Sequence, residues 1–253
     1  MTVATTDIFP QRLTYGYCTE KGKREENQDM ILALPHFFSF AIADGAGGHD
    51  FGRRTSEMTI EAFKTELEQC DQWDTEFLYY LFQKKYKQVN QHIYELGKKF
   101  STSMVTTFSM VNFIHNDVLI SNVGDTKIYR IRNHELQLLS KVHNVAHELL
   151  ERNEITENEL KNHQNKHMLT EAIGGTRSVN PYLKISRMQK GDVIIICTDG
   201  VYQFVDEATL LSLFSHNDQY TNEQLAKLCQ QSVSKALTNG GNDNLSIIAV
   251  SFN

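Results

Sequence analysis

The order of apolar segments along the 253-residue chain limits its fold more than any other feature. Short runs rich in Val, Ile, Phe and Thr, which are typical of strands, come in consecutive groups. A doubly wound parallel sheet would need a helix after nearly every strand, so this order excludes that architecture and favours an α+β fold with antiparallel sheet. The predicted strands cover residues 31–34, 37–43, 104–114, 118–123, 127–131, 192–197 and 245–252, with residues 115–117 as a hairpin loop.

Two pairs of helices separate these groups of strands. Apolar residues between 77 and 96 recur at three- and four-residue steps, which predicts an amphipathic helix of about 25 residues. A shorter helix over 51–69 precedes it, and helices over 206–214 and 222–237 form the second pair. Thr221 and Gln224 have the spacing of a capping box, which marks the start of the last helix. The sequence shows no repeat and no break in composition, so we expect one domain over residues 1–253.

Composition and charge narrow the class of protein. The chain has 25 Lys and Arg residues against 31 Asp and Glu residues, a net charge of −6, which argues against a nucleic acid partner. It contains no apolar run long enough to cross a membrane. Residues 1–7 lack the basic and apolar pattern of a secretory leader. We therefore expect a cytoplasmic protein.

The segment over residues 142–180 is polar and has the weakest pattern, with only short helical stretches. His143 and His147 are four residues apart, as are His163 and His167. Such pairs can bind zinc from one face of a helix. No third ligand accompanies them, so we interpret this segment as a solvated helical surface.

Four aspartates mark points where apolar strands emerge, each with a glycine beside or close to it: Asp44, Asp125, Asp199 and Asp243. A single Asp-Gly pair is usually only a turn. Four at the ends of apolar strands predict carboxylates that converge and repel one another unless cations lie between them. Mg²⁺ and Mn²⁺ prefer such oxygen ligands and usually keep several waters, so a two-metal hydrolytic site is the physical interpretation.

Several short motifs occur in a fixed order between residues 24 and 250: Arg24-Glu-Glu-Asn27-Gln28-Asp29, Asp44-Gly45-Ala46-Gly47-Gly48-His49, Gly124-Asp125-Thr126, Leu169-Thr-Glu-Ala-Ile-Gly174, Asp192 to Gly200, and Asn242-Asp243-Asn244. As an ordered set they resemble those of the metal-dependent serine/threonine protein phosphatases of the PP2C type, most closely the compact bacterial members. The resemblance implies a central antiparallel β-sandwich flanked by a pair of helices on each side, a four-layer αββα arrangement. It also makes the segment around 142–180 a variable, flap-like part of the domain.

The resemblance implies roles for individual residues. Asp44, Asp199 and Asp243 would bind two Mn²⁺ or Mg²⁺ ions, with Asp44 bridging them and the Gly45 carbonyl contributing. Asp125 would hold a weaker third ion together with Asp199. These residues are expectations that the resemblance supplies.

Two further residues would act beside the ions. Asp29 would act through metal-bound water, and Arg24 would bind the phosphoryl oxygens, for which its planar guanidinium is well shaped. The implied reaction is hydrolysis of phosphoserine and phosphothreonine in proteins by a hydroxide that bridges the ions. The partners would be phosphorylated proteins, in opposition to a serine/threonine kinase, and we expect a monomer. A non-catalytic phosphoprotein-binding member of the fold and a metal-dependent phosphodiesterase are the alternatives.

The sequence departs from the family pattern in three places. Val105-Thr106-Thr107 stands where the family has Gly-Thr-Thr, a change that suits a strand and that we expect to be tolerated. Ala46 stands where eukaryotic members carry a histidine proposed as general acid, and His49 cannot simply inherit that role. We therefore expect the leaving alkoxide to take its proton from metal-bound water. Val142 stands where the family has an acid, which bears on substrate docking at the flap-like segment and not on metal binding.

Overall fold

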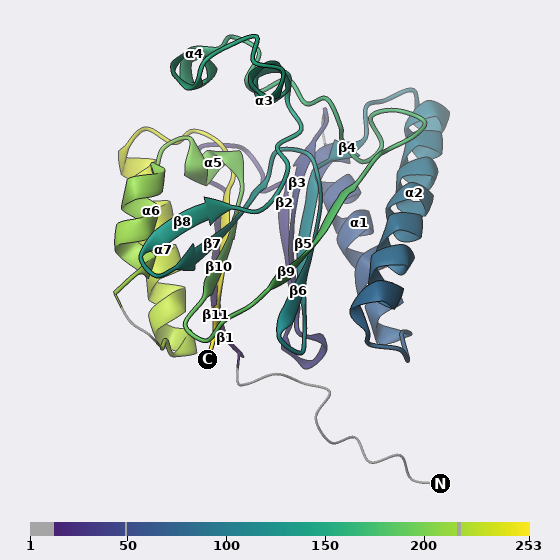
Figure 1. Cartoon of the computed structure of the whole chain (residues 1–253). Coiled ribbons are helices and arrows are strands. Elements are labelled where there is room, and N and C mark those ends of the chain that lie inside the picture. Colours follow the sequence, from purple (N-terminus) through teal and green to yellow (C-terminus); the bar gives the residue numbers. More distant parts are fainter. Residues whose placement is uncertain (1–12, 49, 217–218) are drawn as a thin grey trace, which may run out of the picture.

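The computed structural model describes residues 13–48, 50–216 and 219–253 (Figure 1). Residues 1–7, on which the expectation about a leader depends, lie outside these ranges, and so does His49. Among the described helices, none is long and apolar enough to cross a membrane.

Two antiparallel sheets form the centre of the molecule (Figure 1). The first sheet has the order β1 (Leu13–Glu20), β11 (Leu245–Phe252), β10 (Val193–Cys197), β7 (Lys127–Arg132) and β8 (Glu135–Leu138). The second has the order β2 (Asp29–Leu34), β3 (Ser39–Ala46), β5 (Phe108–Ile114), β6 (Asp117–Val123) and β9 (Tyr182–Arg187), and the short β4 (Val105–Thr106) pairs with the end of β3.

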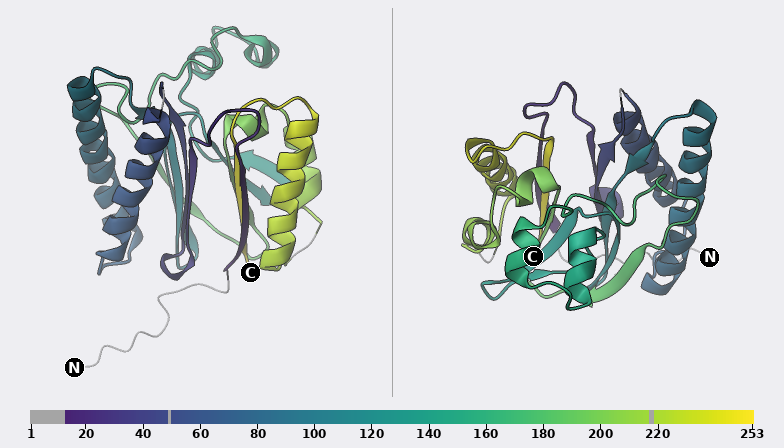
Figure 2. Two further views of the ribbon diagram at one scale, coloured as in Figure 1. Left: turned by 180° about the vertical axis from the view of Figure 1, so that it is seen from behind. Right: turned by 90° about the horizontal axis from the view of Figure 1, so that it is seen from above.

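Helices cover the outer face of each sheet, as both views of Figure 2 show. The second sheet is covered by α1 (Phe51–Glu68) and α2 (Thr75–Phe100), and the first by α6 (Glu207–Phe214) and α7 (Asn222–Thr238), with the short α5 (Asp199–Tyr202) beside them. The predicted α+β, four-layer αββα arrangement is therefore confirmed.

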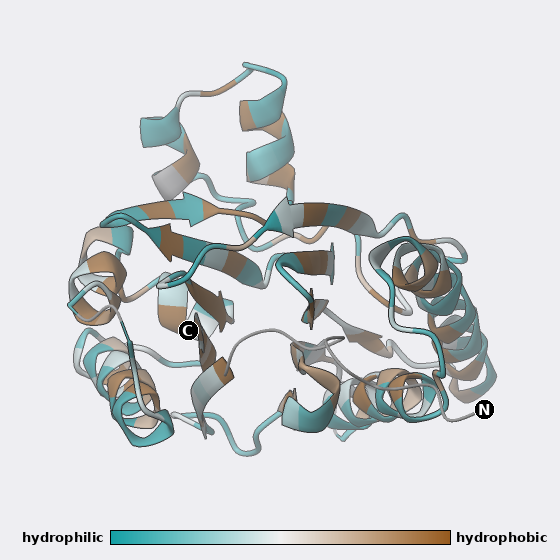
Figure 3. Cartoon of the chain, turned by 60° about the horizontal axis from the view of Figure 1, so that its bottom comes forward, coloured by the Kyte–Doolittle hydropathy of each residue, from teal (hydrophilic) through white to brown (hydrophobic). Residues whose placement is uncertain are grey.

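Three apolar layers hold these four layers together, because successive side chains of a strand point to opposite faces of its sheet. In β3, Phe40 and Ile42 pack between the sheets, whereas the small side chains of Ala41 and Ala43 face the helices. In β11, Ile248 belongs to the layer between the sheets and its neighbours pack against α7. Figure 3 shows the alternation of hydrophobic and hydrophilic residues along the elements. Burial of each large apolar side chain contributes roughly 2 kcal/mol to this packing.

The segment over residues 142–180 projects from one end of the sandwich and carries two short helices, α3 (Val145–Glu151) and α4 (Glu157–Asn162) (Figure 1). Both begin at side-chain caps. Asn144 accepts a hydrogen bond from the backbone N–H of His147, and Thr156 forms a capping box with Glu159.

The structure differs from the sequence predictions at several strand boundaries. The strand predicted over 104–114 is divided at Thr107, between β4 and β5. Ile114 pairs with Asp117, so the hairpin loop has two residues and not three, with His115 in the left-handed region (φ 53°). The strand predicted from residue 37 begins at Ser39, because Pro35–Phe37 form a 3-10 turn that ends at a left-handed Phe38. The strands β1, β8 and β9 were not predicted.

Candidate active site

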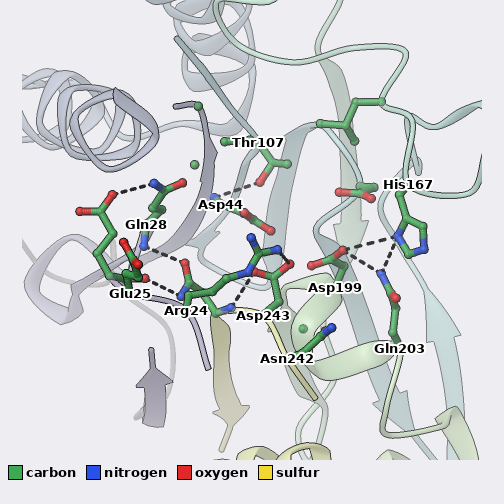
Figure 4. A pocket seen from close by; sticks show the side chains of 18 of the residues that line it. Arg24, Glu25, Gln28, Asp44, Thr107, His167, Asp199, Gln203, Asn242 and Asp243 are labelled. Atoms are coloured by element: carbon green, nitrogen blue, oxygen red, sulfur yellow. Dashed lines mark hydrogen bonds and ion pairs between the residues drawn. The ribbon is translucent and has the colours of Figure 1, made fainter. Parts of the chain in front are cut away.

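A pocket of about 1080 Å³ opens at one end of the sandwich (Figure 4). The four aspartates that the sequence places at strand ends all line it: Asp44, Asp125, Asp199 and Asp243. Arg24 lines it as well. The strands therefore bring together carboxylates from four separate parts of the chain.

The backbone of Asp44 is fixed by Thr106, the last residue of β4, and by Thr107, which follows it. Its carbonyl accepts hydrogen bonds from the Thr107 N–H (2.8 Å) and the Thr106 hydroxyl (2.9 Å), and its N–H donates to the Thr107 hydroxyl (3.1 Å). This is why the predicted strand breaks at Thr107, whose role the sequence did not reveal. Beside it, a Cβ on Gly45 would lie 2.2 Å from the carbonyl oxygen of Gly52, so the close approach of β3 to α1 requires glycine here.

Asp29 lies opposite Asp44 on the neighbouring strand and is only 3% exposed. Its Oδ2 accepts a hydrogen bond from the Thr198 hydroxyl at 3.2 Å, which joins the second sheet to the first. Its Oδ1 is buried and has no hydrogen-bond partner among the described residues. Burial raises the pKa of Asp29 to about 7, and the charges of Asp199 and Asp243 add to the shift.

Three of the carboxylates that line the pocket, those of Asp44, Asp125 and Asp199, have pKa values raised like that of Asp29. Burial raises the pKa of Asp44 well above its usual range, and the charges of Asp29 and Asp199 raise it further. Burial also raises the pKa of Asp125 to about 7 and that of Asp199 to about 6. The site therefore concentrates more negative charge than its surroundings stabilise, and protons or cations would offset it.

Arg24 and Asp243 meet at the rim of the pocket. The Arg24 Nη2 donates to Asp243 Oδ2 at 2.9 Å, and the arginine side chain is 59% exposed. Asn244 fixes the loop that carries Arg24, because its Nδ2 donates to the carbonyls of Lys21 and Glu26 (2.9 Å each) and its Oδ1 accepts from the Gln28 N–H (2.8 Å). The sequence did not reveal this positioning role, although Asn244 belongs to the motif Asn242-Asp243-Asn244.

Asp199 is the first residue of α5 and contacts the segment over 142–180. Its Oδ2 accepts a hydrogen bond from Gln203 Nε2 at 2.7 Å and lies 4.0 Å from His167 Nδ1 (Figure 4). Gln203 Nε2 also lies 3.1 Å from the same histidine nitrogen. His167 was interpreted as part of a solvated surface, and its side chain is indeed half exposed, but it reaches the pocket.

Asp125 follows β6 in a turn that needs glycine before it. Gly124 has φ +101°, and a Cβ there would lie 2.5 Å from the Cβ of Thr107. Asp125 is 6% exposed and hydrogen-bonds to the Tyr202 hydroxyl. The Lys127 ammonium lies 4.4 Å from the centre of the Tyr202 ring.

The donor set of the pocket suits hard divalent cations. In the part of the chain that the structure describes, no three His, Cys, Asp or Glu side chains already form a complete cluster for one ion. Mg²⁺ needs no such cluster, because it keeps several waters and binds through one or two carboxylates. The partnerless Oδ1 of Asp29 and the raised pKa values of the neighbouring carboxylates fit cations in this place.

Comparisons with known proteins place the chain among phosphatases. The sequence model of the family described as Protein phosphatase 2C matches residues 21–240. The serine/threonine phosphatase stp of Listeria monocytogenes serotype 4b is 29% identical over 236 residues, which cover 90% of this chain and 86% of that protein.

Solved structures share the fold. The S. agalactiae serine/threonine phosphatase has a TM-score of 0.88 and 26% identity, over 96% of this chain and 100% of that one. The catalytic domain of the serine threonine protein phosphatase PstP, solved in complex with two manganese ions, has a TM-score of 0.81 and 24% identity, over 94% of this chain and 97% of that one.

Proposed function

The chain belongs to the protein phosphatase 2C family, and on that premise we propose that it hydrolyses phosphoserine and phosphothreonine monoesters in proteins. The observation that carries the proposal is the convergence of Asp44, Asp199 and Asp243 in one pocket, with Arg24 at the rim. Carboxylates suit divalent cations, and a guanidinium suits phosphoryl oxygens, so the pocket combines the two kinds of group that this reaction needs.

The cations in this proposal are Mn²⁺ or Mg²⁺. Two would be held by Asp44, Asp199, Asp243 and the Gly45 carbonyl, with Asp44 shared between them, and Asp125 with Asp199 would hold a weaker third. The chemistry that such ions supply when bound is a more acidic attacking water and neutralisation of charge on the phosphoryl oxygens.

The chain's own residues have separate tasks in this scheme. Arg24, oriented by its ion pair with Asp243, would bind phosphoryl oxygens through its exposed N–H groups. Asp29, buried behind Asp44, would hydrogen-bond water of the site instead of contacting an ion. Ala46 offers no proton to the leaving alkoxide, so that proton would come from water.

Hydrolysis of p-nitrophenyl phosphate and of a phosphoserine peptide, with and without Mn²⁺, tests the proposal. We expect EDTA to abolish turnover of both and Mn²⁺ to restore it. Full turnover in a rigorously metal-free sample would refute the dependence on cations. Preference for bis(p-nitrophenyl) phosphate would favour a phosphodiesterase, and phosphopeptide binding without turnover would favour a non-catalytic regulatory member.

We also propose the wider setting that the sequence suggests: phosphorylated protein substrates, an opposing serine/threonine kinase, and a cytoplasmic monomer. Residues 1–253 would form one domain, with the flap-like segment over 142–180 as a part of it. Sedimentation of the purified protein and fractionation of cells test the monomer and the location. A phosphoproteome comparison after deletion of the gene would identify substrates.

A further inference from the structure

His143 contacts the turn that carries Asp125 with both its backbone and its side chain. Its N–H donates to the Gly124 carbonyl at 3.0 Å, and its Nδ1 accepts a hydrogen bond from the Gly124 N–H at 3.1 Å. The side chain is buried, contrary to the solvated surface that the sequence suggested for this segment. One residue therefore satisfies both polar backbone groups of the glycine that precedes Asp125.

The same residue lies where the chain enters and leaves the part of the flap-like segment that carries α3 and α4. The His143 carbonyl accepts a hydrogen bond from the Thr170 N–H at 3.0 Å. Next to it, Asn144 forms a β-bridge with Leu169, and the Val145 N–H donates to the Met168 carbonyl. The start and the end of the segment that carries α3 and α4 are thus joined at His143.

A second contact fixes the end of β6, just before the Gly124 turn. Asn122, in β6, accepts a hydrogen bond from the Lys141 N–H at 3.1 Å and donates to the Lys141 carbonyl at 2.6 Å. Lys141 and His143 therefore hold the chain before and within the Gly124 turn. Asp125 directly follows Gly124 in the chain, so the orientation of the Gly124–Asp125 peptide determines where the Asp125 carboxylate lies in the pocket.

We propose that His143 is a positioning residue for Asp125: its Nδ1 fixes the Gly124–Asp125 turn and attaches it to the base of the flap-like segment. The consequence for ion binding depends on the proposed function, in which Asp125 helps to hold the weakest ion. An ordinary buried hydrogen bond would affect stability alone, whereas a positioning contact also affects the affinity for that ion. Residues that orient a metal ligand have this effect without touching the metal.

Two substitutions of His143 separate these possibilities. His143→Asn places its Oδ1 where Nδ1 lies and keeps an acceptor for Gly124, whereas His143→Leu has a similar size and no acceptor. Ser39→Ala is the matched control, because it removes a buried hydroxyl that accepts from Asn112 at 2.6 Å, at the other end of β3 from Asp44. It should lower the melting temperature without affecting ion binding.

The measurements are calorimetric titration of metal-free protein with Mn²⁺ and hydrogen exchange of Gly124 and of residues 145–170. We expect His143→Leu to weaken the weakest Mn²⁺ site by about tenfold, the lower scale for loss of an orienting contact. Exchange at Gly124, Val145 and Thr170 should become faster in the same variant. In His143→Asn, both the Mn²⁺ affinity and the exchange rates should stay close to those of the wild-type protein.

Equal Mn²⁺ affinities in His143→Leu and Ser39→Ala would overturn the proposal, whatever the exchange at Gly124, because an ordinary buried hydrogen bond would give the same result. If His143→Leu does not fold, the comparison of His143→Asn with His143→Gln decides, because Gln carries the same acceptor one carbon farther away. Failure of the proposed function is separate. It would appear as absence of turnover in the wild-type protein, while titration and exchange still report on His143.

Discussion

Because Asp29 is buried, we predict that its carboxylate destabilises the metal-free protein at neutral and higher pH. Its pKa is raised from 3.8 to about 7, so the stability that its protonated form contributes is fully present only below pH 3.8 and is lost as the pH rises to about 7. Above that pH the shift corresponds to ~4 kcal/mol. Part of the shift comes from the charges of Asp199 and Asp243, which remain in the variant. We therefore expect Asp29→Asn to raise the free energy of unfolding by about 2 kcal/mol at high pH.

Thermal unfolding in chelator at pH 5 and pH 8 measures this effect. A gain of about 2 kcal/mol corresponds to an increase of about 4–8 °C in the melting temperature for a chain of this size. The increase should be largest at pH 8 and smaller at pH 5, where the folded chain still holds the Asp29 proton but the unfolded chain has already lost it. With saturating Mn²⁺ the order should reverse, because the wild-type carboxylate is then stabilised.

Asp117→Asn is the control for this experiment. It removes a carboxylate at the end of β6 that lies away from Asp125 and the pocket. There Asp117 forms an ion pair with Arg187 at 3.2 Å near the surface. Its effect should not differ between the two pH values. If Asp29→Asn changes the melting temperature equally at pH 5 and pH 8, or lowers it at pH 8 in chelator, the destabilisation inferred from the burial of the Asp29 carboxylate is wrong.

Four further substitutions test the other assigned residues. Changing Asp199 or Asp243 to Asn should lower turnover at least about a hundredfold, because the shape remains and the charge that holds a cation is lost; nearly normal rates at micromolar Mn²⁺ would mean that other acids bind the ions. Arg24→Ala should weaken inhibition by inorganic phosphate while Mn²⁺ affinity, followed by calorimetry, stays close to wild type; unchanged inhibition would make Arg24 a surface residue. Asp125→Asn should keep the melting temperature and raise the Mn²⁺ concentration needed for half-maximal turnover; superimposable titrations would make Asp125 a turn residue.

The sequence predicted the elements whose residues carry a strong periodic pattern. The helices α1, α2 and α7 lie within a few residues of their predicted ranges, because one face of each is buried against a sheet. Capping by Thr221 and Gln224 is present as predicted. The strands β8 and β9 were missed because they lie at sheet edges and their partly exposed residues lack a continuous apolar pattern.

The carboxylates of the site could be placed in sequence because each lies at or near the end of a strong strand. Contacts between distant segments could not be predicted in the same way. Thr107 reaches Asp44, and His143 reaches Gly124, only because the sheets and the flap-like segment place them side by side. No local spacing carries that information. The buried state of His143 was therefore misjudged from its polar neighbours.

The two sheets divide the carboxylates in and beside the pocket between them, and this division explains why the sandwich suits the site. Asp29 and Asp44 lie on β2 and β3 of the second sheet, whereas Asp199 and Asp243 lie beside β10 and β11 of the first. Their spacing is consequently set by the apolar layer between the sheets, where tightly packed side chains leave little freedom to adjust. The hydrogen bond from Thr198 to Asp29 crosses that layer at the edge of the pocket. The repulsion among these acids lowers the stability of the metal-free protein, and the three apolar layers supply enough stability to offset that loss. A cation bound between the sheets would relieve the repulsion, so the same carboxylates would favour its binding.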